Sequence, residues 1–287
     1  MWSLFNLHTH SKFCDGSGEP EEYVKTALEK GFHTIGFSSH APVPFKNNFA
    51  IKNDVELQKY CETIRDLQFR YKDRISIWLA LECDYIDGIS RDFQEFRQIC
   101  RLDYTIGSVH LVRNGNDDDL WFIDGPKVES YDEGIKNVFG GDVRKAISTY
   151  YQQLNRMILT QKPDIIGHFD KIKMHNQNRY FREDDPWYRK LVMESLDIIE
   201  QSGAIIEVNT RGIYKKRCND LYPGQWILKE IIKKDLSITL SADAHRPEEI
   251  DGYYVDALKI LRDIGFKNLV YFKEDGWKHQ VMGHKPI

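Results

Sequence analysis

Two histidines near the start of the chain, His8 and His10, are separated by one residue and follow a short apolar run. If this run is a β-strand, side chains two positions apart lie on the same face, about 7 Å apart. Two imidazoles on one face can bind a single divalent cation. A polar strand end would give the same pattern, so the remaining sequence has to decide between the two interpretations.

Apolar runs elsewhere in the chain also end in a histidine or a carboxylate, and six of the ten histidines lie at such ends. The residues concerned are His8, His10, His40, Glu82, His110, His168, Asp243 and His245, with Asp15 shortly after the first pair. Gathered in one place without cations, these groups would repel one another or stay unpaired. Mixed nitrogen and oxygen ligation suits Zn²⁺, Mn²⁺ or Fe²⁺. The set is too large for one ion and suffices for three if one carboxylate bridges.

The other histidines and the nearby cysteine are weaker candidates for metal binding. Cys14 is an alternative ligand close to the first pair, but its neighbour Asp15 is the better candidate. His175 follows the fifth apolar run and is a candidate for substrate contact. The remaining three are read as structural or tail residues: His33, His279 and His284.

The elements that must position these residues alternate between strands and helices along the whole chain. Strands are expected at 5–11, 34–40, 75–82, 104–110, 164–170, 204–211 and 237–245, with a closing strand at 268–272. Helices are expected at 19–31, 54–72, 90–99, 142–161, 186–202, 224–234 and 253–264. Seven such units without a Rossmann glycine fingerprint favour an α/β barrel of parallel strands. Chemistry in such barrels lies at the carboxyl ends of the strands.

Two polar segments, 113–141 and 171–185, are expected to be loops over the mouth of this barrel. The first is rich in Gly, Asp and Asn and is too long for a bare connection.

Composition excludes several classes of protein. The chain has 287 residues, of which 41% are hydrophobic and 29% charged, and its net charge of −4 lacks the basic excess of proteins that hold long nucleic acids. No apolar stretch is long enough for a membrane span, and no signal peptide is visible at the N-terminus. Five unpatterned cysteines indicate reduced thiols, which predicts a cytoplasmic protein. The oligomeric state is left open.

The motifs together resemble the PHP (polymerase and histidinol phosphatase) superfamily. They are His8-x-His10 with Asp15, Ser39-His40, Glu82, 107–110, Gly167-His168 and 243–245, all in family order. The resemblance implies a distorted seven-stranded (β/α) TIM-like barrel, the PHP fold, as a single domain over residues 1–287. Within the superfamily the chain looks most like the histidinol-phosphate phosphatases of histidine biosynthesis. Segments 38–42, 107–110 and 207–212 carry that closer similarity.

The resemblance also implies a trinuclear metal site. The first metal would be held by His8, His10, Glu82 and Asp243. Glu82 would bridge to a second metal, which His110 and His168 complete. The third would be held by Asp15, His40 and His245. Some relatives have histidine at the position of Asp15, so the metal preference of this third site could differ.

The predicted reaction is the hydrolysis of L-histidinol phosphate to L-histidinol and phosphate. A hydroxide bridging the two metals that share Glu82 would attack phosphorus, and Asp243 or His245 would return a proton to the leaving group. Arg211 is a candidate phosphate clamp, although a surface position in the basic run 215–217 is an equal alternative. Asn209 either positions substrate or caps a strand end. Candidates for contacts to the imidazole and amine are Trp121, Asp119 and His175.

Three rival functions remain at this stage. A PHP nuclease or nucleotide phosphatase would use the same metals, but the neutral-to-acidic charge balance argues against a role on long nucleic acids. The metal-dependent amidohydrolases also begin with His-x-His on a barrel, but Glu82 and the triplet at 243–245 favour the phosphoesterase pattern. A non-enzymatic metal-binding protein would not need so complete a ligand set.

Overall fold

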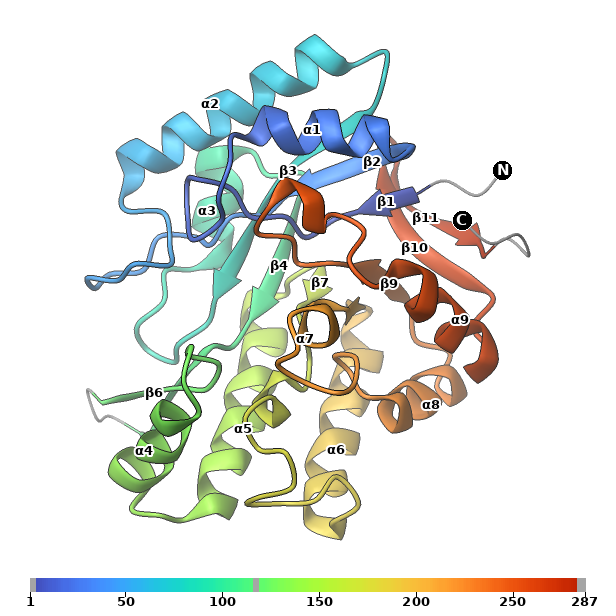
Figure 1. Cartoon of the computed structure of the whole chain (residues 1–287). Helices are drawn as coiled ribbons and strands as arrows, with labels where there is room; N and C mark the ends of the chain where they lie inside the picture. Colours follow the sequence, from blue (N-terminus) through green and yellow to red (C-terminus); the bar gives the residue numbers. More distant parts are fainter. Residues whose placement is uncertain (1–3, 116–118, 283–287) are drawn as a thin grey trace.

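Seven short apolar segments form the parallel sheet at the centre of the computed structural model, which describes residues 4–115 and 119–282 (Figure 1). The strands are β1 (Leu4–Asn6), β2 (Phe32–Phe37), β3 (Ser76–Asp84), β4 (Tyr104–Ser108), β7 (Ile165–Ile166), β8 (Ile205–Asn209) and β9 (Ile238–Ser241). They are hydrogen-bonded in that order, and each neighbouring pair is parallel. The expected class and strand number are therefore confirmed.

The sheet closes almost completely, because the segments that follow its first and last strands meet. Thr9 and Ala244 form a parallel bridge. The backbone N–H of His10 donates to the carbonyl of Ala244 at 2.8 Å, and Ala244 N–H donates to the carbonyl of His8 at 3.2 Å. The fold is thus a nearly closed, distorted (β/α)7 barrel, and the seam of the barrel lies at the first histidine pair.

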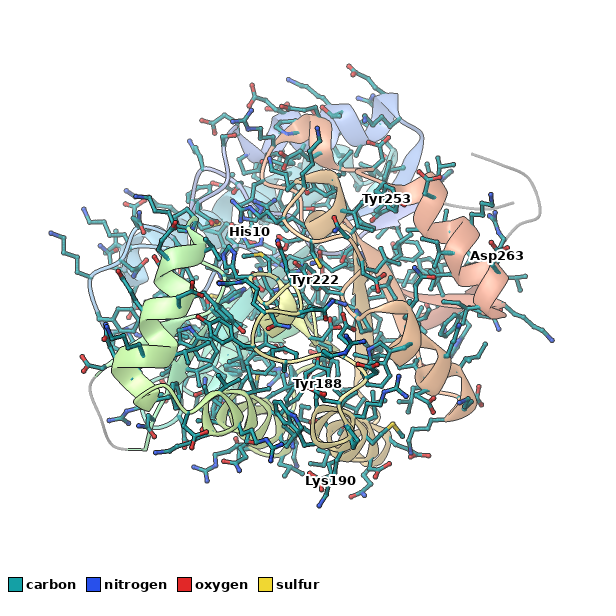
Figure 2. All side chains as sticks on the ribbon, turned by 60° about the horizontal axis from the view of Figure 1, so that its bottom comes forward. His10, Tyr188, Lys190, Tyr222, Tyr253 and Asp263 are labelled. Carbon is teal, nitrogen blue, oxygen red and sulfur yellow. The ribbon has the colours of Figure 1, made fainter. Side chains whose placement is uncertain are left out.

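Helices surround the barrel and agree with the predicted segments to within a few residues. They are α1 (Pro20–Glu29), α2 (Asp54–Tyr71), α3 (Phe93–Cys100), α5 (Val143–Gln161), α6 (Pro186–Ser202), α8 (Gln225–Lys233) and α9 (Tyr254–Ile264). Their starts follow local chemistry: Asn53 and Asp142 accept hydrogen bonds from backbone N–H groups of the first turn of α2 and α5. In Figure 2, Lys190 of α6 and Asp263 of α9 point outward, whereas His10 and Tyr222 lie near the middle. No helix in the described residues is both long and apolar enough to cross a membrane.

The expectation of a loop over 113–141 is wrong. This region contains the hairpin of β5 (Leu111–Arg113) and β6 (Leu120–Phe122), followed by α4 (Val128–Phe139). Trp121 is fully buried here, and its Nε1 donates to the carbonyl of Tyr131 at 3.1 Å. A side chain at Gly134 would collide with the Trp121 ring, since a Cβ there would lie 1.9 Å from it. The region is therefore packed around Trp121, which belongs to the main hydrophobic core. Residues 117 and 118 of its acidic run lie outside the described residues.

The predicted closing strand exists but does not join the barrel. Strand β10 (Asn268–Lys273) pairs antiparallel with β11 (Gly276–Val281) instead. Phe272 and Trp277 of this hairpin pack against Tyr104, which begins β4, with ring centroids 5.8 and 5.7 Å apart. The hairpin thus packs against the N-terminal end of β4, opposite the end at which the candidate ligands lie.

Candidate metal centre

Except for Glu82, which lies near the end of β3, the candidate ligands lie just beyond the carboxyl ends of the strands rather than within them. β1 ends at Asn6 and β7 at Ile166, so His8, His10 and His168 belong to the segments that follow. His168 and Asp243 have positive φ angles of 22° and 51°, a region that non-glycine residues rarely adopt. Such local strain is typical of functional sites, where the surrounding structure holds a side chain in a required direction. Seven of the nine predicted ligands are at most 6% exposed.

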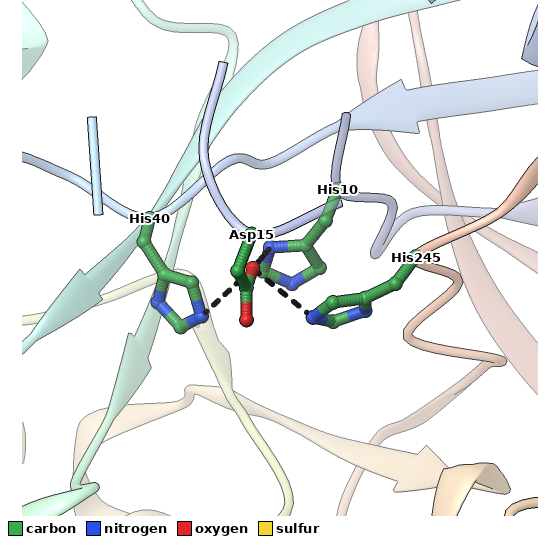
Figure 3. A group of neighbouring side chains, drawn as sticks. All are labelled: His10, Asp15, His40 and His245. Carbon is green, nitrogen blue, oxygen red and sulfur yellow. Dashed lines mark ion pairs between the residues drawn. The ribbon is translucent and has the colours of Figure 1, made fainter. Parts of the chain in front are cut away.

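The first group gathers around Asp15 and is drawn in Figure 3. One carboxylate oxygen of Asp15, Oδ1, lies 3.2 Å from His245 Nε2, 3.7 Å from His10 Nδ1 and 3.9 Å from His40 Nε2. The donor atoms of these four residues lie within 4.8 Å of one another, and all could reach a common ion. The sequence placed Asp15, His40 and His245 together. His10 joins them through Nδ1, the nitrogen that faces away from His8.

The second group consists of His8, His10 and Asp243. The two Nε2 atoms of the histidines lie 3.0 Å apart, and Asp243 Oδ1 lies 3.8 and 3.3 Å from them. Glu82 Oε2 is 3.2 Å from both Nε2 atoms. Asp243 Oδ1 is buried and has no hydrogen-bond donor among the described residues. A buried, unpartnered carboxylate oxygen facing imidazole nitrogens is the arrangement that a bound cation would complete.

The third group lies on the other side of Glu82. Its second oxygen, Oε1, is 2.9 Å from His168 Nε2 and 3.7 Å from His110 Nε2. The Nε2 atoms of His110 and His168 are 3.1 Å apart. Oε2 of Glu82 therefore faces His8, His10 and also His40, whose Nδ1 is 3.3 Å away, whereas Oε1 faces His168 and His110. This division is what a carboxylate that bridges two ions requires.

Two buried carboxylates that were not recognised from the sequence contact the Nδ1 atoms of three histidine rings. Glu207 Oε1 is 2.5 Å from His8 Nδ1, and Glu207 Oε2 accepts the backbone N–H of His168 at 2.7 Å. Asp84 Oδ2 is 2.9 Å from His40 Nδ1, and its other oxygen bonds His110 Nδ1. Such partners leave the opposite ring nitrogen free for a metal. The available signal was a carboxylate inside each of two otherwise apolar strands.

The electrostatics show that this site requires positive charge at its centre. Burial alone would lower the pKa of His8, but the carboxylates of Glu207, Glu82 and Asp243 raise it to about 10. Burial and the neighbouring Lys171 lower the pKa of His168 to about 4, so this ring is a neutral donor. The residues present thus fit divalent metal ions, which would take the place of the proton on His8.

A cavity of about 200 Å³ opens directly onto the three groups. Besides candidate ligands, its lining includes Phe49, Phe122, Asp124, Lys171, Arg211 and Arg217. Arg211, in the short helix α7 (Arg211–Tyr214), is 13% exposed and donates from Nη1 to the carbonyl of Asp243 at 2.7 Å. The structure therefore places Arg211 at the site and not on the outer surface.

Several other candidates do not reach this cavity. Asn209 is fully buried and donates to Glu207 at 3.1 Å and Asp243 at 3.2 Å, so it orients carboxylates. His175 Nε2 lies 2.8 Å from the carbonyl of Gly125. Three more lie elsewhere: Asp119 is exposed, Trp121 is buried in the hydrophobic core, and Cys14 contacts His10 Nδ1 at 3.4 Å without joining a ligand group.

Lys171, by contrast, was not recognised from the sequence. It lies in the 3-10 helix η1 (Lys171–Lys173) after His168, and its ammonium is 2.8 Å from Asp124 Oδ2 and 3.3 Å from His110 Nε2. Its side chain is 10% exposed, and it lines the same cavity as Arg211. The only signal was a lysine three residues after a predicted ligand, in a segment expected to be a polar loop.

The chain is similar to known proteins over most of its length. A probable histidinol-phosphatase of Deinococcus radiodurans is 27% identical over 274 residues, covering 94% of this chain and 97% of the relative. Histidinol-phosphatase of Bacillus subtilis is 29% identical over 273 residues, covering 87% and 96%. The crystal structure of histidinol phosphate phosphatase from Lactococcus lactis, complexed with Zn, L-histidinol and phosphate, has a TM-score of 0.66 at 21% identity. That match covers 96% of this chain and 98% of the other.

A family model described as the PHP domain matches residues 6–211, which contain seven of the nine predicted ligands and both buried carboxylates, Asp84 and Glu207. Because the match extends over well more than half of the 287 residues, this chain belongs to the PHP domain family.

Proposed function

We propose that this protein is a metal-dependent phosphomonoesterase that hydrolyses L-histidinol phosphate to L-histidinol and phosphate. The observation that carries the proposal is that the two oxygens of Glu82 face different sets of histidines in a cavity whose lining also includes Arg211 and Lys171. The substrate is suggested by the three relatives named above, which are a probable histidinol-phosphatase and two histidinol-phosphatases, and by the L-histidinol and phosphate bound to the L. lactis protein.

We assign three divalent transition-metal ions, of Zn, Mn or Fe, to the three ligand groups. His8, His10, Glu82 and Asp243 would hold the first, and Glu82 with His110 and His168 the second. Asp15, His40 and His245 would hold the third. The hydrogen bond between Asp84 and His40 Nδ1 favours the assignment of His40 to the third ion, because it leaves Nε2 of His40 directed at Asp15. When bound, the ions would neutralise the phosphoryl oxygens and lower the pKa of a water molecule.

The protein's own cationic side chains would bind the phosphoryl group. Arg211 is held by the carbonyl of Asp243 through one nitrogen, which leaves other N–H groups of its guanidinium for phosphate oxygens. Lys171 supplies a second positive charge, held in place by Asp124. A proton for the leaving alkoxide would come from Asp243 or His245, which both line the cavity.

A phosphate-release screen of the zinc- or manganese-loaded protein tests the substrate assignment. Histidinol phosphate is expected to exceed nucleotides and sugar phosphates at least tenfold in kcat/KM. If a nucleotide or sugar phosphate were preferred by tenfold, the substrate assignment would fail while the metal phosphoesterase assignment would stand.

Arg211→Ala is expected to lower kcat/KM for the phosphate ester roughly 30-fold, which corresponds to a loss of about 2 kcal/mol of transition-state stabilisation. The reason is that a charge-assisted hydrogen bond is lost in a partly desolvated site. Steady-state kinetics at fixed metal loading measures this loss. Lys216→Ala is the control, since Lys216 lies nearby in the basic run 215–217 but is exposed and does not line the cavity. Unchanged kinetics in the Arg211 variant would remove it from phosphate binding.

A further inference from the structure

One wall of the cavity is aromatic. It is formed by Phe49, from the loop between β2 and α2, and Phe122, from the end of β6. Their rings are stacked, with centroids 6.1 Å apart and an interplanar angle of 30°. Both side chains are only partly buried, although each lies beside a buried candidate ligand. Two partly exposed aromatic rings facing a polar metal site have no role in the metal chemistry.

The position of this wall is fixed by the candidate ligands themselves. The Phe49 ring meets the His40 ring edge-on at 5.4 Å, and the backbone N–H of Ile51 donates to the carbonyl of His40. Phe122 is followed by Ile123, whose N–H donates to the carbonyl of His110 at 3.0 Å. Each ring is thus tied by a short path to a residue of the metal site.

The loop that carries Phe49 is further stabilised by its own side chains. Asn47 Oδ1 accepts the backbone N–H groups of Phe49 and Ala50 at 3.1 and 2.8 Å. A wall held in this way needs little ordering when a ligand binds, which favours recognition of a rigid group.

The lining of the cavity therefore combines cationic and aromatic side chains. Arg211, Arg217 and Lys171 supply the positive charge that suits a phosphoryl group, and Phe49 and Phe122 supply apolar rings for the remainder of the ester. A flat ring stacks well on the faces of such rings, and a positively charged ring gains further from the quadrupole of the phenylalanines.

We propose that Phe49 and Phe122 form the subsite for the imidazole ring of histidinol phosphate and determine the preference for this ester over aliphatic phosphates. The inference rests on the proposed function and deepens it, because the metals and cations would treat all phosphomonoesters alike. Neither phenylalanine was recognised from the sequence, in which Trp121, Asp119 and His175 were the candidates for contacts to the imidazole and amine.

The test compares histidinol phosphate with phosphoethanolamine, which has the amine and the phosphate but no ring. In the Phe49→Leu/Phe122→Leu double variant, kcat/KM for histidinol phosphate is expected to fall about tenfold, from the loss of aromatic contacts. For phosphoethanolamine it is expected to stay within twofold. Phe45→Leu is the matched control, because Phe45 lies in the same loop but lines a different cavity. Zinc content and Tm of each variant show whether the site and fold are intact.

A second measurement separates ring binding from effects on catalysis. Calorimetric titration of the zinc-loaded double variant with L-histidinol is expected to show an affinity about tenfold below that of the wild type, with the affinity for inorganic phosphate unchanged. Phe49→Tyr, which keeps a π face, is expected to bind L-histidinol within threefold of the wild type. Equal losses for histidinol phosphate and phosphoethanolamine, or no loss in the double variant, would overturn the ring assignment alone. A wild-type enzyme inactive on histidinol phosphate would overturn the proposed function together with it.

Discussion

Glu82→Ala is expected to lose two of the three metal equivalents and at least about 10³-fold in turnover. The reason is geometric: Oε2 of Glu82 faces His8 and His10, and Oε1 faces His168 and His110. Removing one side chain therefore takes a ligand from two ions at once. A metal contributes several kcal/mol to the stabilisation of transition-state charge, and about 4 kcal/mol corresponds to this factor.

Elemental analysis of the purified protein, together with kinetics at saturating substrate, measures both effects. Full loading of the wild type should approach three equivalents. Asp15→Ala is the matched variant, because Asp15 belongs only to the group with His10, His40 and His245. The Asp15→Ala variant is expected to bind one metal ion more weakly and to keep the other two. A fully active wild type that saturates near one equivalent would be incompatible with the trinuclear model.

The sequence indicates which residues converge because of where they stand in a barrel of parallel strands, and their role as metal ligands stays a prediction. The ends of such strands converge, so residues that lie far apart in the chain meet at one mouth. The detail differs: β7 has only two residues, and His168 is directed to the site by a positive φ rather than by strand alternation. Local conformations of this kind depend on tertiary packing and leave no periodic signal in the sequence. That residues 1–287 form a single domain remains a prediction.

The missed residues have a common physical cause. Asp84 and Glu207 lie inside strands, and their importance depends on which ring nitrogen they contact, which only the three-dimensional arrangement reveals. The composition of 113–141 wrongly predicted a loop, because its Gly, Asp and Asn residues flank a hairpin and a helix packed around Trp121. At 268–272 the strand pattern was correct, but a pattern does not specify the partner, and the partner is β11.

Glu207→Gln is expected to weaken metal binding and turnover by about 100-fold, at the upper end of the effect of partners that orient metal ligands. The carboxylate accepts from His8 Nδ1 and Ser241 through Oε1, and from His168 N–H and Asn209 through Oε2. A glutamine amide must place its NH₂ at one of these positions. It then faces either the His8 ring or the backbone of His168 with a donor where an acceptor is needed.

In the first orientation the proton of His8 would move to Nε2, the nitrogen that faces Glu82 and Asp243, and would block it as a ligand. In the second, His168 would shift away from Glu82. Zinc titration against a competing chelator measures the affinity, and added zinc should partly restore turnover. Glu183→Gln is the control. Glu183 also accepts a side-chain hydrogen bond, from Trp226 Nε1, but it contacts none of the histidines of the site. Wild-type zinc affinity in Glu207→Gln would show that the rings keep their orientation without this carboxylate.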